Sequence, residues 1–409
     1  MVLAKSEPKI SLEQHIDDCL HICCQLKEAL PDITVRYGME FWKALRTAII
    51  LHDTGKSHVE FQKYLLGKNN EWYHQRHEMF SVYFAQNSDS RDILGSGGLL
   101  AILGHHKSLK DLYNFVDKNY TKDEWCLEDD GLDYNDECKK LNSPFVWNLM
   151  KQYDIEQKTH CPIDLKKIIK SYIRNAKGLL HEQTIENILL VGALKQCDHL
   201  ASAGIQKINC IDSSDFAFLD RITFYDHQKL AGDKEGNVIL TAPTGTGKTE
   251  AALNWLRKQI HSRGKGRVFY ILPYTASINA MYERLFSDIG KDKVGLLHSK
   301  LMQYLDAKFS SSSYDCSSIK KMAENFKTMV TPFKVTTPFQ MLKYLYGLKG
   351  FEKGLVEWSG AYFIIDEIHA YDARTFAQLV VTSFCCKSIG CSCSCDDCDI
   401  TSIYEKRVV

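Results

Sequence analysis

The first two hundred residues repeat apolar positions with a helical period. Met39–Leu51 is apolar on all sides, which predicts a buried helix. The same period returns at 168–176 and at 183–203, so this half of the chain predicts an all-α bundle. Within Ser11–Leu30, which predicts the first helix, the repeating positions are Leu12, Ile16, Leu20, Cys23, Leu26 and Leu30.

The pattern changes in the second half, where short apolar runs alternate with helical stretches. Strands are predicted at Val238–Leu240, Arg267–Leu272, Lys334–Thr337 and Tyr362–Ile365. Alternation of this kind favours a parallel sheet covered by helices. Between 107 and about 175 the period is lost, and we interpret residues 117–140, which are charged and aromatic-poor at their centre, as an insertion or lid.

The strand at Val238–Leu240 leads into a glycine-rich turn and then into a helix from Glu250. Glycines in the turn let backbone N–H groups curl towards phosphate oxygens, and the helix N-terminus adds its positive dipole end. Lys248 then meets the β- and γ-phosphates, while Thr249 offers its hydroxyl to Mg²⁺. The segment predicts an ATP-binding P-loop whose contacts are Thr244, Gly245, Thr246, Gly247, Lys248 and Thr249.

A second strand, Tyr362–Ile365, ends in two carboxylates. Because α/β sheets bind ligands at the carboxyl ends of their strands, Asp366 is predicted to hold Mg²⁺ and Glu367 to polarise the attacking water. An acidic pair at a strand end is on its own more often a helix cap. Beside a P-loop it indicates an ATPase.

The segment Asp366–His369, DEIH, resembles the second motif of superfamily 2 helicases. Phe224–Gln228 resembles the motif in which an aromatic ring, here Tyr225, stacks on adenine and a Gln, here Gln228, reads it. Leu272–Ala276 and Val335–Phe339 resemble two motifs that contact nucleic-acid backbone. The resemblance implies a RecA-like helicase lobe with DNA contacts at Pro273, Tyr274, Thr275, Thr336 and Thr337.

His52–Asp53 ends the buried helix and places an imidazole and a carboxylate in an apolar wall. Burial of both requires a metal or a hydrogen-bond network, and a satisfied core pair is the simpler alternative. Further imidazoles and a carboxylate, however, lie on or at the ends of apolar helical patterns. The resulting candidate metal ligands are His15, His52, Asp53, His77, His105, His106 and Asp198.

This order, with Gly55–Lys56 after His52–Asp53 and an ATPase downstream, resembles the HD phosphohydrolase superfamily. More specifically, it resembles the HD nuclease-helicases of type I CRISPR interference systems. The resemblance implies two divalent ions bridged by Asp53, with His52 and Asp53 catalytic and Lys56 holding the scissile phosphate. Mixed imidazole and carboxylate ligands suit Mn, Fe, Co or Ni. One ion would take His15, His52, Asp53 and Asp198, and the other His77, His105 and His106.

The implied function is antiviral defence, in which the chain cleaves single-stranded DNA and couples cleavage to ATP-dependent helicase or translocase activity. The implied partners are single-stranded DNA and a crRNA-guided surveillance complex of the Cascade type. The expected fold is multidomain: an all-α HD-type helical bundle at 1–215, an α/β RecA-like P-loop lobe at 216–382, and an atypical cysteine-rich tail at 383–409.

Composition refines this interpretation. Residues 1–220 carry 26 basic against 32 acidic side chains, so the basic excess lies in the half predicted to bind phosphates. No apolar run is long enough for a membrane span or a signal peptide, and we expect a cytoplasmic protein without membrane contact.

Two features leave alternatives open. A helicase motor needs a second RecA-like lobe, and no matching motif follows Asp372, so we expect a chain truncated after the first lobe. Cys391, Cys393, Cys395 and Cys398 could form a zinc site, although their spacing favours a disordered or out-of-frame terminus. Rival functions are an HD phosphohydrolase acting on nucleotides under a regulatory ATP-binding lobe, and a non-catalytic ATP-binding docking module.

Overall fold

The computed structural model describes most of the chain, and its described residues form two compact units. The first unit comprises Met1–Leu26 with Arg36–Gln206, and the second Lys27–Val35 with Lys207–Val409. The domain limits drawn from the sequence stay a prediction. The described residues are 1–72, 75–107, 109–120, 133–158, 163–175, 181–309, 315–388 and 392–396.

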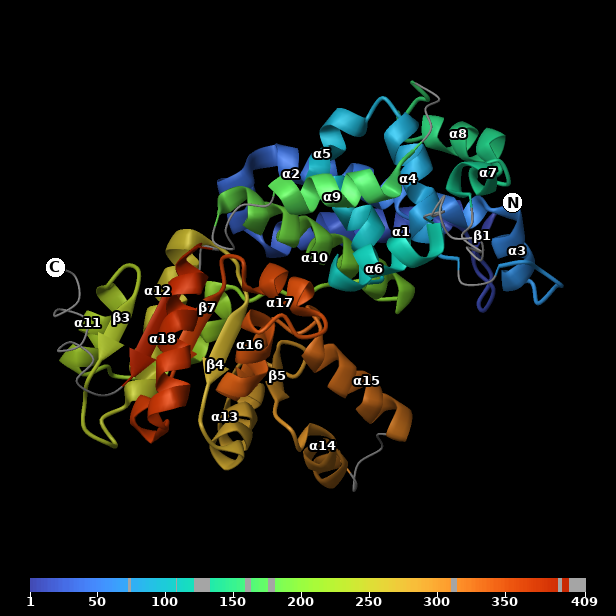
Figure 1. The fold of residues 1–409 in the computed structure, drawn as a ribbon. Coiled ribbons are helices and arrows are strands. Elements are labelled where there is room, and N and C mark those ends of the chain that lie inside the picture. The colour runs from blue at the N-terminus through green and yellow to red at the C-terminus, as the bar shows by residue number, and fades with distance from the viewer. Residues whose placement is uncertain are drawn as a thin grey trace. The chain divides into compact units, whose positions relative to one another are not determined.

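The first unit begins with a short antiparallel hairpin, and a helical bundle follows it in the chain (Figure 1). The helix predicted at Ser11–Leu30 is confirmed as α1, whereas the helix predicted from Met39 begins at Pro31 and bends at Gly38. The elements up to Ser202 are β1 (Leu3–Lys5), β2 (Ile10–Ser11), α1 (Leu12–Ala29), α2 (Pro31–Leu51), η1 (Thr54–Ser57), α3 (Val59–Leu65), α4 (His77–Asn87), α5 (Arg91–Gly104), α6 (Leu109–Tyr120), α7 (Tyr134–Cys138), α8 (Ser143–Lys151), α9 (Leu165–Asn175) and α10 (Glu182–Ser202).

Part of the stretch interpreted as an insertion is integral to the bundle. Tyr134 at the start of α7 stacks on Phe80 of α4, and its hydroxyl donates to the Met79 carbonyl at 2.8 Å. The helices α7 and α8 are too short to give a clear periodic signal, which explains why the sequence did not predict them. Residues 121–132, the centre of the predicted lid, lie outside the described residues.

The second unit is built on a parallel sheet of six strands in the order β3-β8-β7-β4-β6-β5 (Figure 1). Its elements are η2 (Ser213–Arg221), α11 (Asp226–Asp233), β3 (Val238–Leu240), α12 (Lys248–Arg263), β4 (Val268–Ile271), α13 (Thr275–Asp288), β5 (Val294–Leu297), α14 (Leu301–Phe309), α15 (Cys316–Lys327), β6 (Phe333–Thr336), α16 (Pro338–Leu345), α17 (Phe351–Trp358), β7 (Tyr362–Ile365), η3 (Ile368–Ala370), α18 (Ala373–Ser388) and β8 (Ser392–Asp396).

Alternate residues of the central strands enter different cores, because successive side chains of a strand point to opposite faces. Tyr270 of β4 belongs to the apolar cluster that includes Trp255 of α12 and Tyr282 of α13. Its neighbour Phe269 instead stacks on Phe363 and meets the edge of Trp358 on α17. Both faces of the sheet are therefore covered by helices.

The expectation of an unstructured tail is wrong for residues 392–396. Their backbone forms β8 between β3 and β7, with Cys395 opposite Ile365 on one side and Ile239 on the other. A parallel strand needs only backbone partners on both sides, so a polar composition does not prevent it. Cys391 and Cys398 of the predicted zinc site lie outside the described residues.

A buried ion cluster joins β6 to α17 on the face of the sheet that carries Phe269 and Trp358. Lys334, which is 1% exposed, pairs with Glu357, and Arg267 Nε lies 3.8 Å from the same carboxylate. Burial lowers the pKa of Lys334 to about 8 in spite of the Glu357 charge. Because neither cation has water to replace Glu357, the cluster depends on that one carboxylate.

We predict that Glu357→Ala destabilises the second unit by about 3–5 kcal/mol, since two buried cations lose their counter-charge. Urea unfolding followed by circular dichroism measures the change. The matched control is Glu324→Ala, which breaks the exposed 2.7 Å pair with Lys327. It should change the free energy of unfolding by no more than about 1 kcal/mol. Equal effects of the two variants would contradict the buried-cluster account.

Candidate metal centre and nucleotide site

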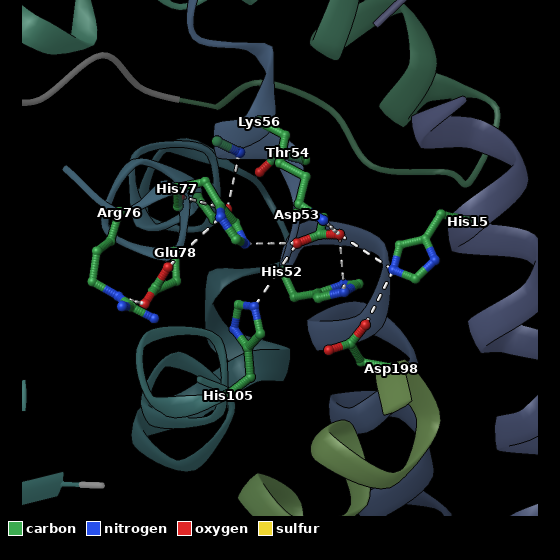
Figure 2. Close-up of polar contacts among 12 residues, drawn as sticks. His15, His52, Asp53, Thr54, Lys56, Arg76, His77, Glu78, His105 and Asp198 are labelled. Atoms are coloured by element: carbon green, nitrogen blue, oxygen red, sulfur yellow. Dashed lines mark hydrogen bonds and ion pairs between the residues drawn. The ribbon is translucent and has the colours of Figure 1, made fainter. Parts of the chain in front are cut away.

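A single carboxylate, Asp53, lies at the centre of the candidate metal site, and imidazoles surround it (Figure 2). Its Oδ1 lies 3.0 Å from His77 Nε2 and 3.8 Å from His105 Nε2. Its Oδ2 lies 3.3 Å from His15 Nε2 and 3.5 Å from His52 Nε2. Residues separated by up to ninety positions in the chain thus converge on one buried group.

Each group is positioned by a different part of the bundle. His15 lies on α1 and Asp198 on α10, and their side chains meet at 3.2 Å. The end of α2 supplies Asp53, the first residue of α4 is His77, and the end of α5 supplies His105. Six of the seven predicted ligands are brought together around Asp53 or Asp198 in these contacts, and His106 joins them by stacking edge-on to His77 with ring centroids 5.1 Å apart.

Backbone carbonyls fix the orientation of two imidazoles. His52 Nδ1 donates to the Ile49 carbonyl at 2.6 Å, and His105 Nδ1 donates to the Ile102 carbonyl at 2.7 Å. A carbonyl can only accept, so Nδ1 carries the proton and the lone pair is on Nε2. In both residues that Nε2 faces Asp53. Hydrogen bonds of this type orient histidine ligands in metal sites.

Buried polar atoms at the centre lack hydrogen-bond partners. Within the described part of the chain, neither His52 Nε2 nor His105 Nε2 makes a hydrogen bond, and Asp53 Oδ1 and His77 Nε2 have no partner other than each other, at 3.0 Å. Buried polar atoms without partners destabilise a fold, so their gathering at one point indicates a missing ligand. Nitrogen and oxygen donors in this arrangement fit divalent transition metals.

The potential ligand atoms separate into two groups on either side of the centre. Within each group the ligand atoms lie within 4.8 Å of one another. One group is Asp53, His77, His105 and His106, and the other is His15, Cys19, His52 and Asp198. The division resembles the two ligand sets expected from the sequence, with Cys19 added.

The electrostatics of the site keep Asp53 ionised and His105 neutral. Burial alone would raise the pKa of Asp53, but the charges of His52 and Lys56 outweigh burial and hold this pKa well below its usual value. Burial lowers the pKa of His105, and the neighbouring imidazoles lower it further. An ionised carboxylate and a neutral imidazole are the forms that bind a cation.

His15 has the opposite behaviour. Burial would lower its pKa, but hydrogen bonds to Asp198 and Asp53 raise it to about 12. A proton on His15 therefore compensates two buried carboxylates, a task that a bound cation would take over. Ser202 supports Asp198 by donating to its Oδ1 at 3.2 Å.

The sequence did not identify two residues beside the centre. Cys19 follows His15 by one helical turn, and this spacing could have revealed it. Glu78 is fully buried beside His77 and pairs with Arg76, a contact that no pattern in the sequence predicts.

Lys56 is the one predicted catalytic cation of this site, and it lies against the central carboxylate. Its Nζ is 2.5 Å from Asp53 Oδ2, and the side chain is largely buried.

The nucleotide motif has the backbone that a P-loop requires. Gly245 and Gly247 have positive φ angles of 81° and 78°, which favour glycine. The helix α12 begins at Lys248, whose Nζ donates to the Ala242 carbonyl at 3.1 Å. Gln228 is buried beneath this loop and donates to the Gly247 carbonyl at 2.8 Å. Thr244 and Thr246 lie on the turn between β3 and α12, and Thr249 is in the first turn of α12.

Gln228 and Tyr225 have different environments. The amide of Gln228 also accepts from the Tyr225 N–H at 2.8 Å, so this side chain joins α11 to the loop. The Tyr225 ring is 66% exposed and stacks on His227, whose Nε2 contacts the Thr246 carbonyl at 3.0 Å. The ring of Tyr225 is thus available to stack on a base, and His227 is a further P-loop contact that the sequence did not predict.

The acidic pair follows β7, at the same edge of the sheet as the P-loop. The Tyr270 hydroxyl donates to Asp366 Oδ2 at 2.7 Å, and the Glu367 N–H donates to Oδ1 at 2.7 Å. Glu367 itself has φ 54°, a strained conformation for a residue other than glycine. Such strain is held only where surrounding structure enforces it, and it is frequent at functional sites.

The candidate DNA contacts follow the neighbouring strands β4 and β6. Tyr274 is 59% exposed, Pro273 and Thr275 flank it, and Thr337 begins α16. Thr336, in contrast, is fully buried, and its hydroxyl donates to the Leu297 carbonyl at 3.2 Å. A direct DNA contact by the Thr336 side chain therefore disagrees with the structure, because that side chain anchors β6 to β5.

Comparison with known proteins finds similarity over both parts of the chain. Residues 227–389 match the family of DEAD/DEAH box helicases. A CRISPR-associated nuclease/helicase Cas3 of Methanothermobacter thermautotrophicus is 26% identical over 398 residues, which cover 85% of this chain and 46% of the relative. The chain is therefore similar in sequence to Cas3 nuclease/helicases.

Two further comparisons also match this chain to Cas3 proteins. A relative in Methanocaldococcus jannaschii, provisionally assigned as a Cas3 nuclease/helicase, is 22% identical over 81% of this chain and 50% of its own length. The crystal structure of T. fusca Cas3–ADP matches with a TM-score of 0.62 at 16% identity, over 95% of this chain and 49% of that one. The chain thus has a Cas3-like fold and spans about half the length of the curated relatives that it matches.

A second solved structure, titled as a CRISPR RNA-guided surveillance complex in a pre-nicking state, contains a chain that matches with a TM-score of 0.54 at 14% identity, over 95% of this chain and 46% of that one. Among the described residues, none of the helices has the length and apolar character needed to cross a bilayer.

We predict that Gly55→Ala disturbs the metal centre by overpacking. A Cβ at Gly55 would lie 2.0 Å from the His77 carbonyl oxygen and 2.7 Å from the Ser81 nitrogen, so η1 and α4 must separate. The expected loss is about 1–3 kcal/mol in the free energy of unfolding, measured by urea denaturation.

Ser57→Ala is the matched control for that variant. Ser57 is equally buried, and its Oγ makes no hydrogen bond within the described residues. Its removal should change stability by less than about 1 kcal/mol. If both variants lose the same stability, close packing at Gly55 is not what holds His77 in place.

Proposed function

We propose that this chain is a metal-dependent nuclease that cleaves single-stranded DNA at the centre around Asp53, joined to an ATP-binding helicase lobe. The observation that supports the nuclease most strongly is the convergence of imidazoles and carboxylates, several with unpaired atoms, on Asp53. The Cas3 relatives are described as nuclease/helicases, which agrees with the proposal.

Two divalent ions of Mn, Fe, Co or Ni would be held by the two groups of ligands, with Asp53 between them. Such a pair supplies a hydroxide near neutral pH and neutralises the oxygens of a phosphodiester. The chain's own residues perform the positioning. His52 and His105 present Nε2 because carbonyls hold Nδ1, and Lys56 places an ammonium where a phosphate would lie.

In the helicase lobe we assign ATP to the P-loop and Mg²⁺ to Asp366. The exposed ring of Tyr225 would stack on adenine, while Lys248 would bind the terminal phosphates. Glu367 would orient the attacking water. Pro273, Tyr274, Thr275 and Thr337, at the strand ends of β4 and β6, would contact the DNA backbone.

We propose as partner a crRNA-guided surveillance complex that presents a single DNA strand. Support comes from the matched chain in the CRISPR RNA-guided surveillance complex. Strand translocation would require a second RecA-like lobe, because that lobe supplies the arginine that stabilises charge in the transition state. Helicase activity is therefore proposed for the whole assembly.

The first test uses Asp53→Ala and His52→Ala. Either variant should reduce Mn²⁺- or Co²⁺-dependent cleavage of single-stranded DNA by about a hundredfold or more, because the bridging carboxylate or an oriented imidazole is lost. The readout is a gel assay with labelled single-stranded and duplex DNA. ATP affinity should stay unchanged in both variants.

Two results would contradict the nuclease. Unchanged cleavage by both variants would show that this centre is not the nuclease site. Release of phosphate from free nucleotides that is not inhibited by competing DNA would favour a nucleotide phosphohydrolase instead. Circular dichroism of each variant excludes loss of fold as the cause.

A complementary variant, Lys248→Ala, should separate the two activities. Loss of the lysine that contacts the β- and γ-phosphates should weaken ATP binding by at least about tenfold. Cleavage of single-stranded DNA without ATP should be retained, since Lys248 lies outside the helical unit. Fluorescent-nucleotide titration measures the affinity. Retained ATP binding would show that the P-loop is not the nucleotide site.

A further inference from the structure

Cys19 lies one helical turn after His15 on α1 and is fully buried. Its Sγ is 3.8 Å from His15 Nε2. The same His15 nitrogen lies 3.2 Å from Asp198 Oδ1. A sulfur, a nitrogen and an oxygen donor therefore meet at one buried point.

A second imidazole completes this half of the centre. His52 Nε2 makes no hydrogen bond within the described residues, and its ring is held by the Ile49 carbonyl through Nδ1. The donor atoms of His15, Cys19, His52 and Asp198 all lie within 4.8 Å of one another. Four donors at such separations can surround a single ion.

The two halves of the centre differ in chemical character. The group of Asp53, His77, His105 and His106 offers only nitrogen and oxygen. The group that contains Cys19 adds sulfur, which prefers softer ions. Thiolate ligands favour zinc, iron and cobalt over manganese and magnesium.

We propose that Cys19 is a ligand of the ion held by His15, His52 and Asp198, and that it makes this half of the centre selective for thiophilic metals. On binding, the Cys19 S–H bond and the N–H bond of protonated His15 break, both protons pass to buffer, and sulfur–metal and nitrogen–metal bonds form without a change of oxidation state. The inference deepens the proposed metal centre and rests on it.

A packing role alone would not place Cys19 at this point. Cys23 lies on the same helix one turn further on, and Cys197 lies beside it on α10; both are buried, as Cys19 is. Cys19 differs because its sulfur reaches a histidine nitrogen within the ligand group. Cys23 is therefore the matched control.

The test is an anaerobic Co²⁺ titration of the full chain after removal of metal, with absorption spectra and elemental analysis. The wild type and Cys23→Ser should both show a near-ultraviolet sulfur-to-cobalt charge-transfer band as Co²⁺ occupies the metal sites of the helical unit. Cys19→Ser should lose that band. In competition, its preference for Zn²⁺ over Mn²⁺ should fall by at least about tenfold.

Each outcome has a distinct meaning. Two bound equivalents without the band in the wild type overturn the ligand role of Cys19 and leave the metal centre standing. A band that persists unchanged in Cys19→Ser comes from other cysteines, such as those at 391–398, and also overturns the role. If the wild type binds no metal at all, the proposed function itself fails. Cys19→Ala serves as the second variant if Cys19→Ser does not fold.

Discussion

The helical unit depends on one buried negative charge. Asp53 is 1% exposed, and a carboxylate removed from water needs strong compensation. Several kcal/mol would be lost if its partners were absent. Imidazoles from α1, α2, α4 and α5 and the ammonium of Lys56 provide this compensation. The requirement to satisfy Asp53 therefore links the assembly of the bundle to the assembly of the candidate metal centre.

The second unit also brings together residues that lie far apart in the chain. A parallel sheet brings the carboxyl ends of its strands to one edge, so motifs far apart in sequence meet without any contact between their strands. Asp366 and the P-loop are examples, since β8 lies between β7 and β3. The buried pair of Lys334 and Glu357 fixes β6 against α17 behind this edge. The candidate nucleotide-binding residues thus lie on loops, while the strands and the buried ion pair hold these loops in position.

Sequence patterns predicted the elements that carry long-range periodicity or motif spacing. The helix α1, the strands β3 and β7 and the P-loop all lie where these patterns placed them. Helices α7 and α8 were missed because short amphipathic segments give weak periodic signals. The strand β8 was missed because its polar residues resemble a tail, although backbone pairing alone suffices to form it.

The candidate site was predictable only in part. Each histidine was visible as a polar residue at the end of an apolar helix, but the sequence could not show which atoms meet. The roles of Cys19 and Glu78 depend on tertiary contacts with His15 and His77, and no local pattern encodes such contacts. Thr336 lies in a segment that resembles a helicase motif, yet the burial of its side chain disagrees with the side-chain contact to DNA that the motif suggested.

The central claim is that Asp53 joins two ions in one centre. Electron paramagnetic resonance of the chain reconstituted with two equivalents of Mn²⁺ tests it most directly, because ions that share a carboxylate are magnetically coupled. The account predicts a coupled dinuclear signal that disappears in Asp53→Ala. A spectrum from isolated Mn²⁺ ions alone, with both equivalents bound, would contradict it.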